Sequence, residues 1–462
     1  MPLTQRSLQG LWLKALLFAL FGYALLGKGF AYLFLGELIL VLGALIFLQS
    51  QRVMLVFSDP VLFLWGLFAF WGFCRTVPFV PKYHFDAVRD AVLWAYGLFA
   101  LLIAAFINTS SQISRALNGY RRFLRWYLPV LPLLVPLDLF RSIQPTLPWA
   151  KDVSVVMVRA GEMAVHLTAA VVFLLLFPDR GADSGKQGIS IYRLIGFAGL
   201  SLGFLEVIVT SRGGLLAFMV PMVLVSILRT QKIGLKVAAF GAIIVLSSLL
   251  FLESNLVTIT IKGQPVTTDQ INDKIGSIFG GGHSSGALED DKTFRLVWWR
   301  KIVQYTVFGP YFWTGKGFGV NLSVEDGPPG MQKDQMLLLR SPHNGNMTVL
   351  ARMGVPGAII WAALNVVFVF RLFTAYRLAV RSGSRFWSGV DLWILCCWMA
   401  AFINMSFDVY LEGPQGGVWF WSVIGFGVAA LRVQAYEERQ ALAQARIQVT
   451  ETSNFEYSSV HA

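Results

Sequence analysis

One histidine stands out as a candidate for acid–base chemistry, because it follows a strongly basic stretch and directly precedes an apolar run. The sequence there reads Arg340-Ser341-Pro342-His343-Asn344. Serine is a common N-cap and proline suits the first helical position, so we expect a helix to begin here with His343 in its first turn. The positive end of a helix dipole disfavours a protonated imidazole, and a neutral histidine is a competent general base.

Three polar residues are candidates for supporting this base. Asn344 and Asn346 lie beside His343 in the sequence, and either amide could orient the imidazole ring. The third is Asp408, which follows a late apolar run. Asp408 and Glu412 are both candidates for a carboxylate near the outer face of the membrane. A lone histidine is often a surface or capping residue. The position of His343 after a basic stretch nevertheless favours a catalytic role.

Arg212 is a candidate for binding phosphate. It lies in the segment Thr210-Ser211-Arg212-Gly213-Gly214, between two apolar runs with almost no loop. The paired glycines let the backbone approach a ligand closely, while the guanidinium forms two parallel hydrogen bonds with phosphate oxygens. The alternative is an interfacial arginine at a tight helix turn, but a charge at such a point is costly to keep.

A long hydrophilic stretch, 254–342, separates two sets of apolar runs. Several cations gather in it around the candidate base: Arg295, Arg300, Lys301, Lys316, Lys333 and Arg340. A cationic surface beside a bilayer suits a phosphate-bearing lipid. A channel or a simple anchor has little use for such a surface, so the chain is interpreted as a membrane enzyme.

Membrane helices must position these residues. Of the 462 residues, 56% are hydrophobic and 14% are charged, whereas charged residues make up about a quarter of a soluble domain. Lipid-exposed backbone must be helical, which predicts an all-α polytopic membrane protein. We count about twelve apolar runs long enough to span, near residues 11–27, 33–49, 60–78, 91–107, 123–140, 161–177, 194–210, 214–228, 235–253, 343–370, 388–407 and 415–431.

The basic residues of the short loops predict the orientation. They fall on one side of the membrane when both chain ends are cytoplasmic, and this places the hydrophilic stretch outside. The expected organisation is about nine transmembrane helices in 1–253, a periplasmic loop in 254–342, about three helices in 343–432 and a cytoplasmic tail in 433–462. The external side then carries basic residues that this rule does not explain. They either bind phosphates at the outer leaflet, or pair with acids and reach headgroups: Arg75, Lys82, Arg89, Arg141, Lys151 and Arg159.

Several functional classes find no support in the sequence. Cys74, Cys396 and Cys397 lie in apolar runs without metal-ligand spacing, and no HExxH or DxD motif occurs, so we expect neither a metal nor another cofactor. The formal net charge is +12, but the basic residues are spread over short external loops and match no nucleic-acid module. Membrane lipids and a phosphate-bearing substrate are the expected partners, and nucleic acid is not.

Three groups of short motifs resemble the O-antigen ligase and polymerase superfamily of multispanning bacterial inner-membrane glycosyltransferases. The first is Ser211-Arg212-Gly213-Gly214. The second runs from Arg295 to Trp299 and continues through Gly309-Pro310 to Gly315-Lys316-Gly317-Phe318-Gly319. The third is Pro342-His343-Asn344, leading through Leu350 to Gly354 and Gly357. The family pattern commonly has leucine four residues after the histidine, where this chain has Met347 of similar bulk.

The resemblance implies a GT-C-type enzyme at the periplasmic face of a Gram-negative inner membrane, which takes a glycan from undecaprenyl diphosphate without a metal. In a ligase the acceptor is a sugar of lipid A-core. His343 would deprotonate the acceptor hydroxyl, and Arg212, Arg295 and Arg340 would hold the diphosphate and stabilise the charge that develops on it. Attack from the opposite face would invert the anomeric centre.

Two alternatives to a ligase stay open. A polymerase of the same superfamily uses the same chemistry, and the wide basic surface favours a ligase with a phosphorylated core acceptor. A lipid-linked glycan transporter or flippase belongs to a different class. It would place charged or broken helices near the bilayer midplane, often in two related halves, and no matching halves are visible in this sequence.

Overall fold

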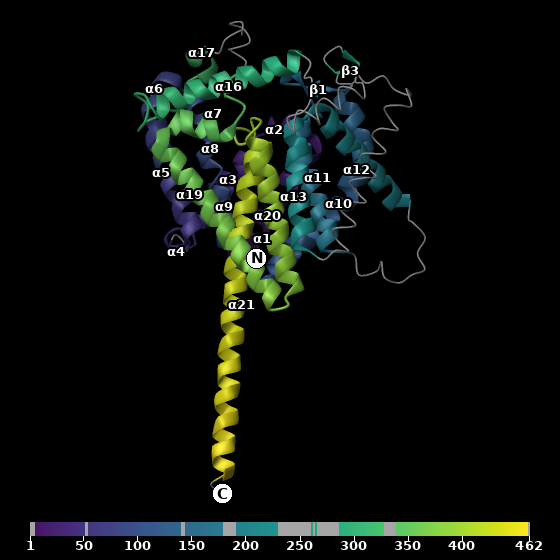
Figure 1. The fold of residues 1–462 in the computed structure, drawn as a ribbon, viewed down its shortest axis with the longest axis vertical. Coiled ribbons are helices and arrows are strands. Elements are labelled where there is room, and N and C mark those ends of the chain that lie inside the picture. The colour runs from purple at the N-terminus through teal and green to yellow at the C-terminus, as the bar shows by residue number, and fades with distance from the viewer. Residues whose placement is uncertain are drawn as a thin grey trace.

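The computed structural model describes residues 5–50, 54–139, 144–178, 191–229, 260–261, 264–265, 286–327 and 339–460. This part of the chain is mostly helical (Figure 1). Its strands form two small antiparallel pairs: β1 (Thr146–Leu147) with β2 (Ala150–Ser154), and β3 (Thr260–Ile261) with β4 (Gln264–Pro265). The predicted run 235–253 and Lys333 lie outside the described residues.

Five helical segments in the described ranges are long and apolar enough to cross a membrane. They are Ser7–Leu26, Pro60–Tyr83, Gly345–Arg381, Arg385–Met405 and Pro414–Gln444. A sixth span is possible if Phe85–Ala95 and Leu98–Phe106, bent by 42°, count as one. Four shorter apolar helices accompany them: Leu35–Leu48, Ala160–Leu176, Leu194–Ile208 and Arg212–Leu228. A mostly helical polytopic membrane protein is therefore confirmed, and the total of twelve spans stays a prediction.

The helices that form the bundle carry the labels of Figure 1. They are α1 (Gln5–Leu26), α2 (Lys28–Ala31), α3 (Leu35–Leu48), α4 (Leu55–Ser58), α5 (Pro60–Thr76), η1 (Val77–Phe79), α6 (Val80–Tyr83), α7 (Phe85–Asp90), α8 (Val92–Ala95), α9 (Leu98–Phe106), α10 (Ser110–Leu139), α11 (Ala160–Leu176), α12 (Ile191–Thr210), α13 (Arg212–Leu228), α19 (Gly345–Arg381), α20 (Arg385–Met405) and α21 (Pro414–Val460). Two more helices, α16 (Gly286–Thr306) and α17 (Leu322–Asp326), belong to the predicted external loop.

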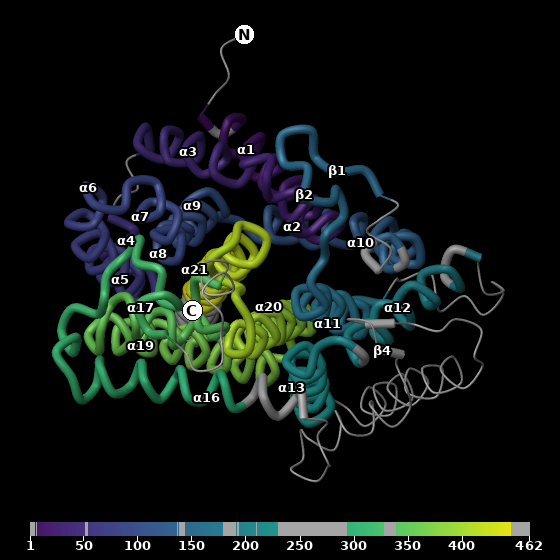
Figure 2. The backbone as a smooth tube through the Cα atoms, turned by 90° about the horizontal axis from the view of Figure 1, so that it is seen from above, coloured from purple at the N-terminus to yellow at the C-terminus, as the bar shows by residue number. Residues whose placement is uncertain are grey.

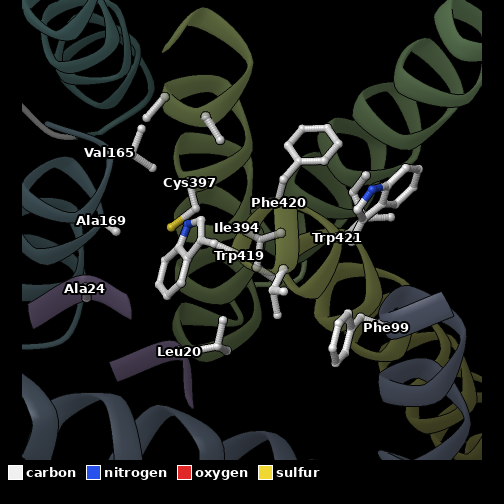
Figure 3. Packing of buried hydrophobic residues seen from close by; sticks show 14 of the residues in the cluster. Leu20, Ala24, Phe99, Val165, Ala169, Ile394, Cys397, Trp419, Phe420 and Trp421 are labelled. Atoms are coloured by element: carbon white, nitrogen blue, oxygen red, sulfur yellow. The ribbon is translucent and has the colours of Figure 1, made fainter. Parts of the chain in front are cut away.

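Helices α20 and α21 form the centre of the bundle. Of the most apolar 18-residue window in each, 72% is buried for α20 and 83% for α21, against 33% for the span Pro60–Tyr83. Figure 2 shows the other helices arranged around this pair. The core is rich in aromatic rings, and Figure 3 shows Trp419, Phe420 and Trp421 of α21 pointing to different sides of the helix. A charged residue placed here would lose its hydration, so the polar chemistry is expected at the ends of these helices.

The last helix is longer than the sequence suggested. The sequence predicted a tail in 433–462 without assigning it a long helix, whereas α21 continues as one helix to Val460 and extends beyond the bundle (Figure 1). The segment around 437–446 is rich in Glu, Gln, Ala and Arg, which have high helix propensity. Helix propensity therefore accounts for the helix over 437–446.

Helix α16 crosses the opposite end of the bundle from the extension of α21 (Figure 1). It is held by Asp326, whose fully buried carboxylate accepts hydrogen bonds from Trp298 at 2.7 Å and from Lys316 at 2.5 Å. A small apolar cluster of Trp298, Ile302 and Val320 packs α16 against α19. This described part of the predicted external loop is thus a packed cap that brings its cations to the helix ends.

Candidate active site

Helix α19 begins at Gly345, two residues after His343, the candidate base. Asn344 is its N-cap and accepts hydrogen bonds from the backbone N–H groups of Asn346 at 2.9 Å and Met347 at 3.2 Å. His343 has φ 50°, a left-handed conformation outside any α-helix. The prediction that Ser341 caps the helix and that His343 lies in its first turn is therefore wrong. Asparagine is as good an N-cap as serine, and Asn344 has both the extended backbone and the side-chain bonds of a cap.

His343 faces a carboxylate. Its Nδ1 lies 3.3 Å from Oδ1 of Asp408, which follows the end of α20. The same oxygen accepts the backbone N–H of Val409 at 2.7 Å and lies 3.9 Å from Nη1 of Arg159. Burial raises the pKa of Asp408, but the hydrogen bond from His343, the charges of Arg159 and His343 and the N–H of Val409 outweigh it and lower the pKa overall. Asp408 is thus an ionised partner for the ring.

The two asparagines have other partners. Asn344 caps α19, as described. Asn346 donates to the hydroxyl of Ser406 at 3.0 Å and accepts the indole N–H of Trp361 at 2.9 Å. These contacts join the start of α19 to the end of α20, so the asparagines fix the helix ends that carry His343 and Asp408.

Arg340 is bound to acidic residues of α7. Its Nη1 lies 3.3 Å from Asp86, and its Nη2 lies 3.0 Å from Asp90 and donates to the carbonyl of Gly319 at 3.0 Å. The Arg340 side chain is 22% exposed and Asp90 is 7% exposed. Paired but still partly open, Arg340 keeps a position from which its guanidinium can reach an anion.

Asp90 forms ion pairs with more than one arginine. Arg352, which is only 1% exposed, lies 3.0 Å from the same Oδ2 atom of Asp90, and Arg89 lies 3.5 Å from its Oδ1. Arg352 also donates to the carbonyls of Gly317 and Val320, at 3.3 and 3.2 Å. A buried arginine needs such compensation for its lost hydration. This network connects α7, the segment 315–319 (the glycine turn) and α19.

The glycine turn forms hydrogen bonds with α19 where that helix is broken. Gly354 has φ 68° and interrupts the helix, and the freed carbonyls of Ala351 and Arg352 accept the N–H groups of Lys316 at 2.7 Å and Gly317 at 3.0 Å. Gly317 has φ 79°, and a Cβ atom there would meet the ring of Phe79 at 2.2 Å. Only glycine fits both the backbone conformation and the space. The turn therefore locks α19 to the helices around Asp90.

A cavity of about 330 Å³ opens at these residues. It is lined by both acidic and basic groups around His343: Arg89, Asp90, Arg159, Leu339, Arg340, Ser341, His343, Val409 and Glu412. Burial and the charge of Asp90 raise the pKa of Glu412, against the opposing effects of Arg352 and of hydrogen bonds with Thr348 and Ser341. Three arginines face two carboxylates in this lining, so the cations are in excess and the cavity is suited to an anion.

The other predicted phosphate-binding residues lie beside this cavity and do not line it. Arg295 of α16 donates to the carbonyl of Phe407 at 2.7 Å. Arg212 is the first residue of α13, and a Cβ atom on the adjacent Gly213 would lie 2.8 Å from Phe407. Arg295 and the start of α13 therefore both lie near Phe407, which directly precedes Asp408.

Sequence reasoning did not assign a role in the site to Arg89, Arg159, Arg352 or Glu412. Arg89 and Arg159 were visible as basic residues on the external side, and Glu412 as a carboxylate near that face. Arg352 also had a signal, since it stands alone in an otherwise apolar run after the histidine. What the sequence lacked was the distance information that joins residues 89, 159 and 340 around one cavity.

Fold and site together define a polytopic helical membrane protein with an acid–base pair and a cationic cavity at one end of its bundle. Residues 196–362 match the family described as O-antigen ligase, and this match supports membership of the O-antigen ligase/polymerase superfamily. No curated protein matches the chain. The family supports a glycosyltransferase-like enzyme of lipopolysaccharide biosynthesis. The matched region contains Arg212, Arg295, Arg340 and His343, while Asp90, Arg159 and Asp408 lie outside it.

Proposed function

We propose that this protein is an O-antigen ligase of the GT-C type, which transfers a glycan from undecaprenyl diphosphate to a sugar of lipid A-core. We place the reaction at the periplasmic face of the inner membrane and infer that it inverts the anomeric centre and needs no metal. The observation that carries the proposal is the cavity that brings His343, backed by Asp408, together with three arginines.

His343 is the proposed general base. With Nδ1 donating to Asp408, Nε2 is the nitrogen that accepts a proton. It takes that proton from the acceptor hydroxyl as the oxygen attacks the anomeric carbon. The negative charge of Asp408 stabilises the imidazolium that results, in the way that an aspartate supports the histidine of a hydrolase triad.

The arginines act on the leaving group. As the acceptor oxygen bonds to the anomeric carbon from one face, the bond to the diphosphate oxygen breaks on the other, and charge grows on the diphosphate. Arg89, Arg159 and Arg340 line the cavity in which this charge would develop. Fixed cations in a partly dehydrated site stabilise such a charge without reorganisation. Arg212 and Arg295 are proposed to extend the cationic surface along the diphosphate.

The test is transfer of a labelled glycan from undecaprenyl diphosphate to lipid A-core by purified protein in EDTA. The variant His343→Asn is better than His343→Ala, because asparagine tolerates the left-handed backbone of this position and cannot act as a base. We expect the variant to lose about 10²- to 10⁴-fold in kcat, with little change in thermal stability.

The outcomes separate the candidate functions. Transfer by the wild type alone supports a ligase with His343 as base, whereas equal transfer by both proteins assigns His343 a structural role. Chain growth on the lipid donor without transfer to lipid A-core would identify a polymerase. Movement of the intact donor across vesicle bilayers without bond cleavage would identify a flippase.

A further inference from the structure

A second and larger cavity lies away from His343. It measures about 550 Å³ and is enclosed by α1, α9, α10, α20 and α21. On α20 it reaches Trp393, Ile394 and Cys397. Cys397 precedes the end of α20 at Met405 by eight residues, or about 12 Å along the axis. The cavity therefore reaches α20 near its middle and α10 in its first half, whereas the proposed active site lies beyond the C-terminal end of α20.

The wall of this cavity is apolar. Aliphatic and aromatic side chains from several helices face it, among them Leu13, Leu17, Leu20, Ile103 and Phe426. Figure 3 shows Leu20, Ile394, Cys397 and Trp419 around this part of the core. Such a wall suits a hydrocarbon chain.

The mouth of the cavity is cationic. Lys14 of α1 and Arg115 and Arg122 of α10 line it and are exposed, and no acidic residue is among its lining residues. Arg115, Asn118, Gly119 and Arg122 are spaced at intervals of three and four, so they share one face of α10. Gly119 leaves room between the two arginines. A single anion at this mouth would meet three cations and one amide.

Two buried hydrogen-bond donors lie deeper. Trp419 and Ser422 of α21 line the cavity and are 5% and 6% exposed. Among the described residues, neither the indole N–H of Trp419 nor the hydroxyl of Ser422 has a hydrogen-bond partner. A buried polar group without a partner costs free energy, and a ligand with acceptor oxygens removes that cost.

We propose that this cavity binds one anionic glycerophospholipid, with its phosphate between Lys14, Arg115 and Arg122, its ester oxygens near Trp419 and Ser422, and an acyl chain against the apolar wall. The charge at the mouth selects an acidic headgroup. The inner donors favour an acyl ester over an isoprenoid chain, which has no oxygen beyond its phosphate. The inference is independent of the proposed transfer reaction, because binding is measured without it.

The experiment is native mass spectrometry of the delipidated protein with phosphatidylglycerol, phosphatidylcholine or undecaprenyl phosphate. We expect the wild type to retain one phosphatidylglycerol. The triple variant Lys14→Gln, Arg115→Gln, Arg122→Gln should weaken that binding on the order of a hundredfold. A matched control removes three exposed arginines elsewhere, Arg377→Gln, Arg381→Gln, Arg385→Gln, and should bind as the wild type does.

A second variant fills the cavity without touching its charge. At Gly119 an added Cβ atom meets only Leu17, at an ordinary 3.7 Å, so Gly119→Leu should fold, elute as the wild type on size exclusion and lose the lipid. Retention of the lipid by Gly119→Leu would overturn the placement. Equal retention of phosphatidylcholine, or loss in the control variant, would overturn the headgroup assignment, and preference for undecaprenyl phosphate would replace the proposed ligand with the isoprenoid lipid.

Discussion

At the scale of single residues, the contact between His343 and Asp408 is the first to test. Asp408→Asn keeps the shape of the side chain but removes the charge that stabilises an imidazolium. We expect kcat for glycan transfer to fall about a hundredfold, with KM for the lipid donor nearly unchanged, because Asp408 does not line the cavity. Steady-state kinetics at several donor concentrations measure this split.

A conservative change elsewhere provides the control for Asp408. Asp152 is an exposed aspartate on β2, and Asp152→Asn should leave both constants unchanged. If Asp408→Asn raised KM and left kcat intact, the carboxylate would act in binding and not through the histidine.

Glu412 predicts a pH dependence of donor binding. Burial, with the nearby charge of Asp90, raises its pKa, so the carboxyl is neutral below that pKa and charged above it. As pH rises through the raised pKa, the cavity gains a negative charge that repels the diphosphate, and KM for the donor should rise about tenfold. Glu412→Gln keeps a neutral side chain and should give a flatter profile. Glu325→Gln, on an exposed side chain of α17, should retain the wild-type profile, and a flat profile in the wild type would contradict the prediction.

At the scale of elements, the glycine turn holds the broken helix α19 in place. Gly317→Ala adds the cost of a left-handed alanine, about 1 kcal/mol, and a clash with Phe79 that costs about 1 to 3 kcal/mol more. We expect a lower thermal unfolding temperature and a higher donor KM, since Arg352 and Gly319 would shift together with the turn.

Gly383 offers a matched control for this backbone argument. It has φ 74°, close to that of Gly317, but nothing lies within 4 Å of a Cβ atom placed there. Gly383→Ala is therefore destabilised only by the left-handed backbone of alanine, and it should leave donor KM unchanged. Equal effects of the two substitutions in thermal unfolding and kinetics would show that the clash with Phe79 plays no role.

The helices also show which features of the fold could be predicted from the sequence. Apolar runs predicted the polytopic helical class, because hydrocarbon forces the backbone to bond within a helix. Five of the helices in the described ranges, or six with the bent pair, are long and apolar enough to span. The start of α19 was misplaced by three residues, since Ser341 and Asn344 are both good N-caps and the left-handed conformation of His343 depends on its tertiary contacts. The pairing of Asp408 with His343 needed the packing of α19 on α20, and sequence alone could only name both residues.

At the scale of the whole molecule, the family match and the site have different extents. The matched region, 196–362, holds the predicted base and phosphate-binding arginines. Asp90, Arg89 and Arg159 come from the part of the chain before it, and Asp408 and Glu412 from the part after it. The cavity therefore exists only when three parts of the chain pack together. The ion pairs of Asp90 with Arg340 and Arg352 are one polar link between the first part and the matched region.

This link predicts strong coupling between distant parts of the chain. Asp90→Asn leaves Arg352 buried at 1% exposure without its counter-charge, which should cost about 3 to 5 kcal/mol. Arg352→Met alone should cost less, because Asp90 keeps its contact with Arg340 at 3.0 Å. The double variant should recover stability relative to Asp90→Asn, with a coupling energy of about 1 to 3 kcal/mol in a thermal-unfolding cycle. It should stay impaired in donor binding, because Arg340 has lost the carboxylate that fixes it beside the cavity. Additive losses in the cycle would mean that Asp90 and Arg352 do not stabilise each other and that other contacts hold the two parts of the chain together.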